Sequence, residues 1–185
     1  PDYDIVLIEE WGYRAPSEAA DLISEVLPGN AKILDAGCGT GITGKALYDA
    51  GFRQIHGVDI SEASLEIAKA SGVYTALLPC DLQKPLPFED DSFDAAQCIG
   101  VLTYIKGDGV LREFIRIVRP GGYICFTQRS DLNESLKFEQ TLTRMEKDGL
   151  WRRIRKSSPQ PYLPGNPDFG DKIKVIYFLY QVSES

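Results

Sequence analysis

Three carboxylates and a run of glycines stand at positions that suit the binding of a nucleotide-like ligand. Asp35 comes just before the stretch Gly37–Gly41, which reads Gly-Cys-Gly-Thr-Gly, and Asp59 and Asp81 follow further along the chain. Glycines just past a strand let the backbone approach a ligand closely, and the helix that follows offers free N–H groups. Carboxylates accept hydrogen bonds from amines and hydroxyls. The pattern therefore predicts a site for a ligand that carries such groups.

The glycines fit two overlapping patterns. One is GxGxG, starting at Gly37, and the other is GxGxxG, running from Gly39 to Gly44. The second is typical of dinucleotide sites, where the first glycine falls at the strand end. Here the strand is expected to end near Ala36, so that Gly37 is the turn glycine. This register favours GxGxG and leaves the dinucleotide pattern as the alternative.

The carboxylates favour one ligand over the other. Asp35, beside the glycine loop, would repel a pyrophosphate and attract an ammonium group. Asp59 ends the second predicted strand, where a carboxylate can accept both hydroxyls of a ribose, in either kind of ligand. Asp81 follows the third strand, where it can accept from the exocyclic amine of an adenine. Amine, ribose and adenine together indicate S-adenosylmethionine.

Alternating strands and helices must position these residues. Hydrophobic periodicity and turn residues predict helices at 17–27, 42–50, 61–71, 109–118 and 131–148 and strands at 31–36, 54–60, 73–80, 93–102, 123–128, 151–157 and 172–182. The first helix is expected to have Ser17 as its N-cap, and the last an Asp131/Glu134 capping box. The run 119–122, RPGG, is expected to be a sharp stop. The alternation predicts an α/β fold with a parallel sheet and helices on both faces, and the last two strands must pair antiparallel.

Composition limits the possible functions. The 185 residues are 43% hydrophobic and carry a net charge of −7, which argues against broad binding to phosphate backbones. We expect residues 1–185 to form one domain, preceded by residues missing before Pro1. Four cysteines without a CxxC pair indicate free thiols in a reducing compartment, cytoplasm or nucleus, and a single histidine, His56, leaves no His-rich metal site. We expect no metal, no membrane association and a monomer.

The successive motifs ILDAGCGTG, GVDIS, CDLQKPLPFEDDSFD and RPGG resemble those of class I S-adenosylmethionine-dependent methyltransferases. The residues YD at 3–4, WGYRAP at 11–16 and TQR at 127–129 are most similar to the methyltransferase-like proteins of the Williams–Beuren region type. The resemblance covers about residues 13–182. It implies a Rossmann-like three-layer sandwich whose seven-stranded sheet has the order 3-2-1-4-5-7-6, with strand seven antiparallel.

The resemblance also implies roles for individual residues in binding S-adenosylmethionine. The methionine part would lie against Asp35 and the backbone of Gly37, Cys38 and Gly39. Ribose and adenine would be held by the residues after the second and third strands, namely Asp59, Ile60, Asp81 and Leu82. The methyl end and the cover of the site would come from Cys98, Ile99, Tyr13 and Arg14.

Two residues are candidates for the catalytic role. Tyr104 follows the fourth strand and Arg129 follows the fifth, and ligands of α/β folds bind at these carboxyl ends. Methyl transfer mainly requires alignment of acceptor, methyl and sulfur. The sequence offers no paired His–Asp or Cys–His base, and tyrosine is a poor base at its usual pKa near 10. An acceptor that needs little deprotonation fits best.

The acceptor is expected to be a small molecule rather than nucleic acid. No base-methylating Asn-Pro-Pro-Tyr or Asp-Pro-Pro-Tyr run follows the fourth strand, and the irregular stretch 158–170 has the size to cover a compact ligand or to be a plain connection. The alternatives are a non-catalytic S-adenosylmethionine-binding protein, a protein or RNA methyltransferase, and a nicotinamide-dependent oxidoreductase. Asp94, His56 and the basic run 152–156 are interpreted as structural: a strand-entry residue, a packed or edge side chain, and a charged edge strand.

Overall fold

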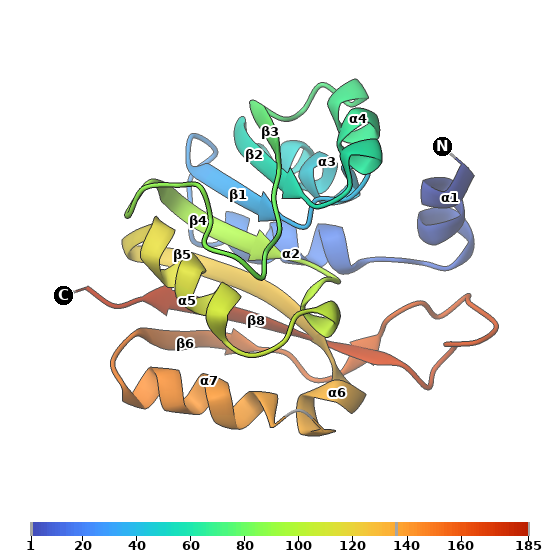
Figure 1. The fold of residues 1–185 in the computed structure, drawn as a ribbon. Coiled ribbons are helices and arrows are strands. Elements are labelled where there is room, and N and C mark those ends of the chain that lie inside the picture. Colours follow the sequence, from blue (N-terminus) through green and yellow to red (C-terminus); the bar gives the residue numbers. More distant parts are fainter. Residues whose placement is uncertain (1, 136, 185) are drawn as a thin grey trace.

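A single twisted sheet forms the centre of the molecule (Figure 1). The computed structural model describes residues 2–135 and 137–184. Within them the sheet has eight strands, in the spatial order β3-β2-β1-β4-β5-β8-β6, with β7 pairing β8 off this path. The strands are β1 (Lys32–Ala36), β2 (Gln54–Asp59), β3 (Ala76–Pro79), β4 (Phe93–Cys98), β5 (Val118–Arg129), β6 (Trp151–Lys156), β7 (Gln160–Pro161) and β8 (Lys174–Val182).

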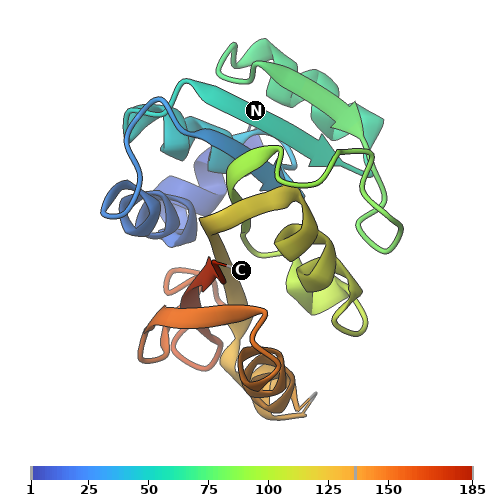
Figure 2. The same ribbon diagram turned by 90° about the vertical axis from the view of Figure 1, so that its left-hand side faces the viewer.

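Helices cover both faces of the sheet, and Figure 2 shows α2 and α5 on opposite sides. The helices are α1 (Asp2–Ile5), the π-helix η1 (Val6–Glu10), α2 (Ala15–Ser24), α3 (Ile42–Asp49), α4 (Glu62–Ala70), the short 3-10 helix η2 (Leu102–Tyr104), α5 (Gly109–Ile117), α6 (Ser130–Ser135) and α7 (Phe138–Lys147). Two apolar clusters result. One includes Phe114, Phe126 and Trp151, and the other includes Ile23 and Ile55. The predicted three-layer α/β fold is confirmed.

The strand order brings the predicted ligand residues to one edge. Strands β3, β2, β1, β4 and β5 are parallel, and β8 runs antiparallel between β5 and β6. Because parallel strands end at the same edge, the glycine loop after β1 lies beside Asp59 of β2. The expected order, with an antiparallel seventh strand, is confirmed, and β7 is an additional two-residue strand.

Three local predictions were wrong. The run 119–122 was expected to separate a helix from a strand. It lies inside β5 instead, where the pairing with β4 shifts between Phe93 and Ala95, so the glycines form an irregularity within the strand. The helix expected at 131–148 is divided into α6 and α7. Asp131 lies inside α6, which begins at Ser130, and its carboxylate pairs with Arg129; the side chain of Glu134 lies outside the described residues.

The first core helix also begins earlier than predicted. It starts at Ala15 with Pro16 in its first turn, and the Ser17 hydroxyl donates to the Arg14 carbonyl 3.0 Å away, so Ser17 is not the N-cap. Ser61, by contrast, caps α4 as expected, since its hydroxyl accepts from the Ser64 N–H at 3.2 Å.

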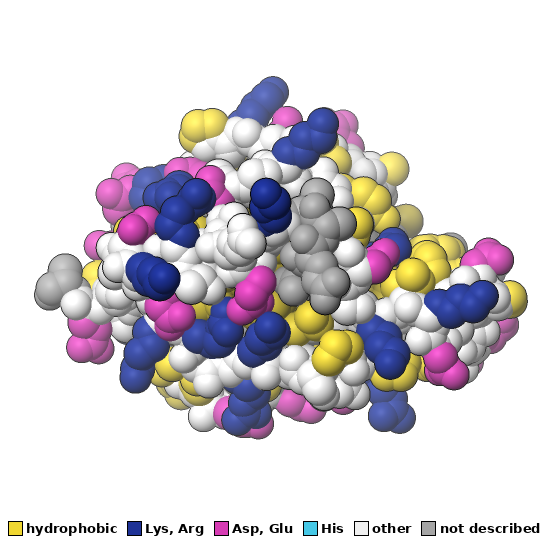
Figure 3. Space-filling view, turned by 90° about the horizontal axis from the view of Figure 1, so that it is seen from below, with side chains coloured by type: hydrophobic (Ala, Val, Ile, Leu, Met, Phe, Trp, Pro, Cys, Tyr) yellow, Lys and Arg dark blue, Asp and Glu magenta, His cyan; other side chains and the backbone are white. Residues whose placement is uncertain are grey.

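The surface shows no continuous basic area on the face that Figure 3 displays, where Lys and Arg side chains are interspersed with Asp and Glu. Within residues 2–135 and 137–184, none of the helices has the length and apolar character needed to cross a bilayer.

Candidate functional site

A cleft opens at the carboxyl ends of β1, β2 and β3, beside the glycine loop. Its volume is about 150 Å³, and among the residues lining it are Gly37, Asp59, Ile60, Asp81, Leu82, Val101, Tyr104 and Ile105. Six of these, all except Val101 and Ile105, are residues that the sequence marked as functional. The Ile60 side chain is 71% exposed. An apolar side chain exposed beside two carboxylates suits a ligand with one flat apolar face and polar edges.

The first three N–H groups of the glycine loop are already occupied. Those of Gly37 and Cys38 donate to the Val58 carbonyl at 2.8 and 3.0 Å, and that of Gly39 donates to Asp59 Oδ2 at 2.8 Å. These N–H groups are therefore not free to cradle a pyrophosphate. Gly39 has φ +54°, and a side chain built there would meet nothing within 4 Å. The loop thus offers open space for a ligand, and glycine is the residue its backbone conformation favours.

Gly44, the third glycine of the GxGxxG pattern, leaves space for a side chain of the protein rather than for a ligand. A Cβ built on Gly44 would overlap the hydroxyl and ring of Tyr74, and one built on Gly57 would lie 2.8 Å from the same ring. Tyr74 therefore fills a socket between α3 and β2 that two glycines leave open. The GxGxxG spacing arises from the packing of a tyrosine, which removes the structural reason for a dinucleotide site.

Tyr74 belongs to a buried network around Asp35. The Tyr74 hydroxyl accepts from the Gly44 N–H at 3.0 Å and donates to Asp35 Oδ2 at 2.7 Å. Thr43 and Gln97 also donate to the carboxylate, at 2.7 and 2.9 Å. Burial raises the pKa of Asp35, and the hydrogen bonds from Tyr74, Gln97 and Thr43 act in the opposite direction.

Asp35 does not line the cleft, and its role in holding the methionine part stays a prediction. Its exposed fraction is 0%, and it lies beneath the glycine loop, not in the cleft. The carboxylate has a structural role, because it accepts hydrogen bonds from α3, from β4 and from the segment before β3 and so holds them at the end of β1. Sequence reasoning missed Tyr74 and Gln97. A glutamine within the apolar strand β4 was the available signal, since a buried amide needs polar partners.

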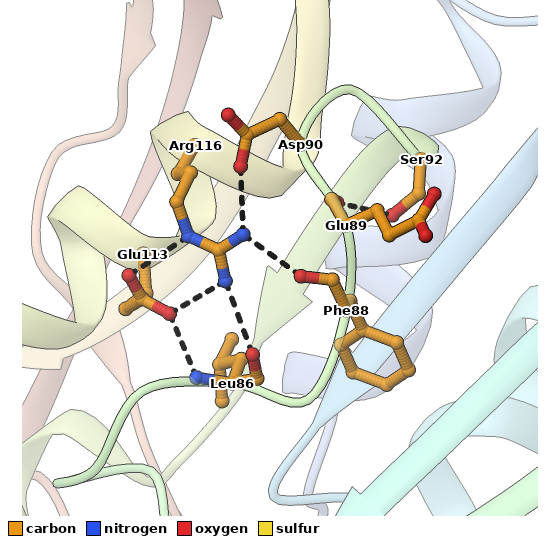
Figure 4. Close-up of polar contacts among 7 residues, drawn as sticks. All are labelled: Leu86, Phe88, Glu89, Asp90, Ser92, Glu113 and Arg116. Atoms are coloured by element: carbon orange, nitrogen blue, oxygen red, sulfur yellow. Dashed lines mark hydrogen bonds and ion pairs between the residues drawn. The ribbon is translucent and has the colours of Figure 1, made fainter.

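Arg116 on α5 anchors the loop that follows the cleft residues Asp81 and Leu82 (Figure 4). Its guanidinium donates to the carbonyls of Leu86 and Phe88, at 3.1 and 2.8 Å, and to the Asp90 carboxylate at 2.9 Å. It also contacts both carboxylate oxygens of Glu113, which accepts from the Leu86 N–H at 2.7 Å. This set of bonds fixes the course of the loop from the cleft to β4.

A pair of tyrosines covers the end of β4. The rings of Tyr13, before α2, and Tyr162, after β7, meet edge to face with centroids 5.6 Å apart. A Cβ on Gly100 would lie 2.9 Å from the Tyr13 hydroxyl oxygen and 3.3 Å from that of Tyr162. Both hydroxyls therefore stand over Gly100, next to Val101 of the cleft.

The two segments that carry these tyrosines are locked to each other. The Gly165 N–H donates to the Trp11 carbonyl at 3.2 Å, and a Cβ on Gly165 would overlap the Glu10 carbonyl. A Cβ on Gly12 would lie 3.2 Å from Pro164. The stretch 158–170 thus covers this part of the carboxyl edge together with the N-terminal segment.

The two candidate catalytic residues lie on either side of this cover. Tyr104 is 79% exposed and lines both the cleft and a second, mainly apolar chamber of about 370 Å³. Arg129 donates to both oxygens of Asp131, at 2.8 and 3.2 Å, and its guanidinium lies 5.7 Å from the centre of the Phe169 ring. The structure brings both residues to the carboxyl edge.

The remaining predicted ligand residues lie away from the cleft. Arg14 lines a separate cavity of about 680 Å³ between α2 and the strands β6–β8. Cys98 and Ile99 are buried in the apolar clusters on opposite faces of the sheet. The Cys38 side chain is buried as well, close to Gly57. These side chains do not line the cleft, so any contact they make with a ligand there has to come from their backbone.

The residues interpreted as structural have structural partners. Asp94 accepts from the Lys32 N–H at 2.8 Å and from Arg119 at 2.6 Å, where β4 begins. His56 packs edge to face on Phe93, and burial lowers its pKa, as does the charge of Lys32. The basic strand β6 is the edge of the sheet. The four cysteines are free thiols, and no group of side chains in the described part of the chain is arranged to hold a metal ion.

Comparison with known proteins identifies the family to which the chain belongs. Residues 34–126 match the family described as Methyltransferase domain. The chain is 40% identical over 161 residues to methyltransferase-like protein 27 of Homo sapiens, covering 83% of this chain and 65% of that protein. It is 35% identical over 141 residues to the malonyl-[acyl-carrier protein] O-methyltransferase of Erwinia pyrifoliae, covering 75% of this chain and 49% of that protein. The chain thus spans about half to two thirds of the length of these relatives.

The fold also matches solved structures. A SAM-dependent methyltransferase from Methanosarcina mazei superposes with a TM-score of 0.71 at 19% identity, over 89% of this chain and 98% of the other. At that identity the likeness establishes the fold.

Proposed function

Because the chain belongs to the class I S-adenosylmethionine-dependent methyltransferases, of the methyltransferase-like type, we propose that it transfers the methyl group of S-adenosylmethionine to a small molecule. The observation that supports this most directly is the cleft beside the glycine loop, whose lining includes Gly37, Asp59, Ile60, Asp81, Leu82 and Tyr104.

The cleft residues fit S-adenosylmethionine part by part. Asp59 would accept from the ribose hydroxyls, Ile60 and Leu82 would contact the adenine, and Asp81 would accept from its amine. At about 150 Å³ the cleft has room for the adenosine part rather than the whole ligand. The open space over Gly39 would take the methionine part. Gln97 Oε1, next to Asp35, is a buried acceptor without a partner in the described residues, which suits an ammonium group nearby.

When bound, S-adenosylmethionine supplies a methyl group on a sulfonium, which leaves as a neutral thioether. The protein has to hold the acceptor in line with that methyl group, and such alignment can contribute several kcal/mol, on the order of 7 or more in favourable cases. Tyr13, Tyr104 and Tyr162 stand where the acceptor would approach. We propose that these side chains orient the acceptor, with Tyr104 and Arg129 in direct contact with it.

The chamber of about 370 Å³ supports a small acceptor. It adjoins the cleft through Tyr104 and Ile105, which line both spaces. Its volume lies within the range of small-molecule sites, roughly 300–1,000 Å³. The names of several relatives point the same way, since they describe methyltransferases that act in ubiquinone and menaquinone biosynthesis. A monomer is part of the proposal, because the cleft and chamber are built from one chain.

The test combines binding with labelling. Calorimetry with S-adenosylmethionine should show one site per chain. Incubation with methyl-labelled donor should label a small-metabolite fraction and leave total RNA and histones unlabelled. Label in RNA or histones alone would replace the small-molecule acceptor, and donor binding without transfer to any of the three would indicate a non-catalytic binding protein.

A further inference from the structure

We propose that the methyl acceptor is a carboxylate, held by the hydroxyls of Tyr13 and Tyr162 and by Arg129, with its apolar part in the chamber beneath Tyr104. This inference rests on the proposed methyltransferase function and names the substrate class. The product would be a methyl ester.

Hydrogen-bond donors converge on one point of the carboxyl edge. The Tyr13 and Tyr162 hydroxyls both stand over Gly100, and each affects the pKa of the other. Arg129 reaches the same region, since its guanidinium lies 5.7 Å from the centre of the Phe169 ring, and that ring lies 6.3 Å from the ring of Tyr162. The hydrogen bond to Asp131 raises the pKa of Arg129. The Arg129 guanidinium, two of whose N–H groups are bonded to Asp131, keeps further N–H groups that together with the tyrosine hydroxyls suit an anionic oxygen ligand, since guanidinium groups pair well with carboxylates.

The titratable groups described around this point are poorly placed to act as a base near neutral pH, and the carboxylate of Asp131 is already paired with Arg129. Burial is the largest cause of the raised pKa values of Tyr13 and Tyr162, so each hydroxyl keeps its proton. The Cys98 thiol is buried and its pKa is raised. The carboxylate of Asp35 is enclosed by its own donors. The other charged or titratable groups facing the point are Tyr3, Tyr104, Lys106, Arg129 and Asp131.

A carboxylate is the acceptor that needs no base. Its usual pKa, near 4, leaves it ionised at neutral pH, whereas an alcohol, a phenol or an ammonium group would first have to lose a proton. In the transfer, one carboxylate oxygen donates an electron pair to the methyl carbon, and the bond from that carbon to sulfur breaks with its electron pair remaining on sulfur. The negative charge of the carboxylate and the positive charge of the sulfonium cancel, and no proton moves.

The chamber gives the rest of the acceptor an apolar place. Leu102, Ile105, Leu111, Leu132 and Phe138 line it, with Gln128 and Thr103 as polar groups at the β5 side. Tyr104 lines both the chamber and the cleft, and Arg129 ends β5 at the same carboxyl edge, so an acceptor that extends from the chamber over this edge would present its carboxylate to the guanidinium. An aliphatic or aromatic carboxylic acid matches this combination.

The first experiment reads the chemistry of the product. The protein is incubated with tritium-methyl-labelled S-adenosylmethionine and a panel of aliphatic and aromatic carboxylic acids, phenols and amines. We expect labelled product from the acids only, and mild alkali should release its label as volatile methanol. Methyl ethers and methylamines keep their label under these conditions. Label that is stable to alkali would overturn the proposal, while the proposed methyltransferase function would stand.

The second experiment tests the residues. For a carboxylic acid that is methylated, Arg129→Gln should raise the KM by about ten- to a hundred-fold, because a charged hydrogen bond is lost. Arg129→Lys should recover part of this, and Tyr162→Phe should raise the KM several-fold. The calorimetric Kd for S-adenosylmethionine should stay within about twofold. Arg152→Gln on β6, whose guanidinium bonds Gln181 far from the cleft, is the matched control. An unchanged KM in Arg129→Gln would contradict the assignment.

The pH profile gives an independent reading. With a carboxylate acceptor, kcat/KM should be flat from about pH 6 to 9, since none of the facing side-chain types has an ordinary pKa in that range. A rate that rises about tenfold per pH unit would show that the acceptor must be deprotonated, and would overturn the proposal.

Discussion

The two halves of the carboxyl edge are built in different ways. On the donor half, the glycine loop, Asp59 and Asp81 follow β1, β2 and β3, and short-range bonds such as Gly39 N–H to Asp59 fix their positions. On the acceptor half, Tyr13, Tyr162 and Arg129 come from three segments far apart in the chain. The donor half repeats one unit, a strand followed by a polar residue. The acceptor half depends on a lock between the N-terminal segment and the stretch 158–170.

The difference indicates which half is general and which is specific. A ligand common to many enzymes can be held by residues that a repeated strand–loop unit supplies. In the proposed site, the acceptor is held by loops that can change without disturbing the sheet. Substitutions that affect one half and leave the other intact test this division.

The largest effect is expected at the socket for Tyr74. Gly44→Ala should lower the free energy of unfolding by about 3 kcal/mol or more, because its Cβ overlaps the tyrosine and the helix or the ring has to move. Urea unfolding measures this. Gly109→Ala is the control, since a Cβ there meets nothing within 4 Å. Equal midpoints for the two variants would show that the socket is not tight.

Asp59→Ala should break the donor half alone. Loss of a charged hydrogen-bond partner weakens S-adenosylmethionine binding by about ten- to a hundred-fold, from roughly 1.5–3 kcal/mol. Calorimetry gives the Kd, and far-UV circular dichroism checks the fold. Asp49→Ala, at the surface of α3, is the control. If the Kd is unchanged, Asp59 does not hold the ribose.

Gly165→Ala should affect the acceptor half alone. A Cβ there overlaps the Glu10 carbonyl, so the stretch 158–170 must shift and carry Tyr162 with it. We expect kcat/KM for the acceptor to fall several-fold, about 1 kcal/mol, with the donor Kd within twofold. Steady-state kinetics and calorimetry measure the two effects. A weaker affinity for S-adenosylmethionine with an unchanged kcat/KM would show that this stretch belongs to the donor half and not to the acceptor half.

The smallest effect concerns the loop anchored by Arg116. The hydrogen bond from Arg116 lowers the pKa of Glu113, and so does the bond from the Leu86 N–H, whereas burial raises it. A lowered folded-state pKa gives stability that is present above the unfolded value, near 4.3, and is lost as the pH falls through the folded value.

Glu113→Gln should therefore cost about 0.5–1.5 kcal/mol at pH 6, and the difference from the native protein should shrink towards pH 3. Urea unfolding at both pH values measures it, with Glu66→Gln on the exposed face of α4 as the control. A difference that grows on acidification would contradict the sign.

The sequence was informative for residues whose position depends on a single strand or helix. Strand ends mark Asp59 and Asp81, and the Ser61 cap fixes the start of α4, so the cleft could be outlined before the fold was known. The pairing of Tyr13 with Tyr162 could not, because it joins segments whose proximity depends on the whole sheet. Tyr74 was missed because its partners, Gly44 and Asp35, come from two other elements.

Local signals were also misleading where tertiary packing overrides them. The glycines at 121–122 are typical of a stop, but the pairing of β4 with β5 carries the strand through them. Asp131 has the spacing of a capping box, but Arg129, two residues before it, is a stronger partner for its carboxylate. The resemblance grouped Arg14 with Tyr13, and the structure places the Arg14 side chain in a separate cavity, because neighbouring side chains at the start of a helix point in different directions.

The Gly44–Tyr74 socket has an evolutionary consequence. A larger residue at position 44 can be accommodated only when the residue at position 74 becomes smaller, and the hydroxyl given up there must be replaced by another donor to Asp35. Positions 44 and 74 should therefore change together among descendants of a common ancestor. A lineage that loses the tyrosine would be released from the third glycine, and the resemblance to a dinucleotide fingerprint would disappear from its sequence while the ability to bind the methyl donor remained.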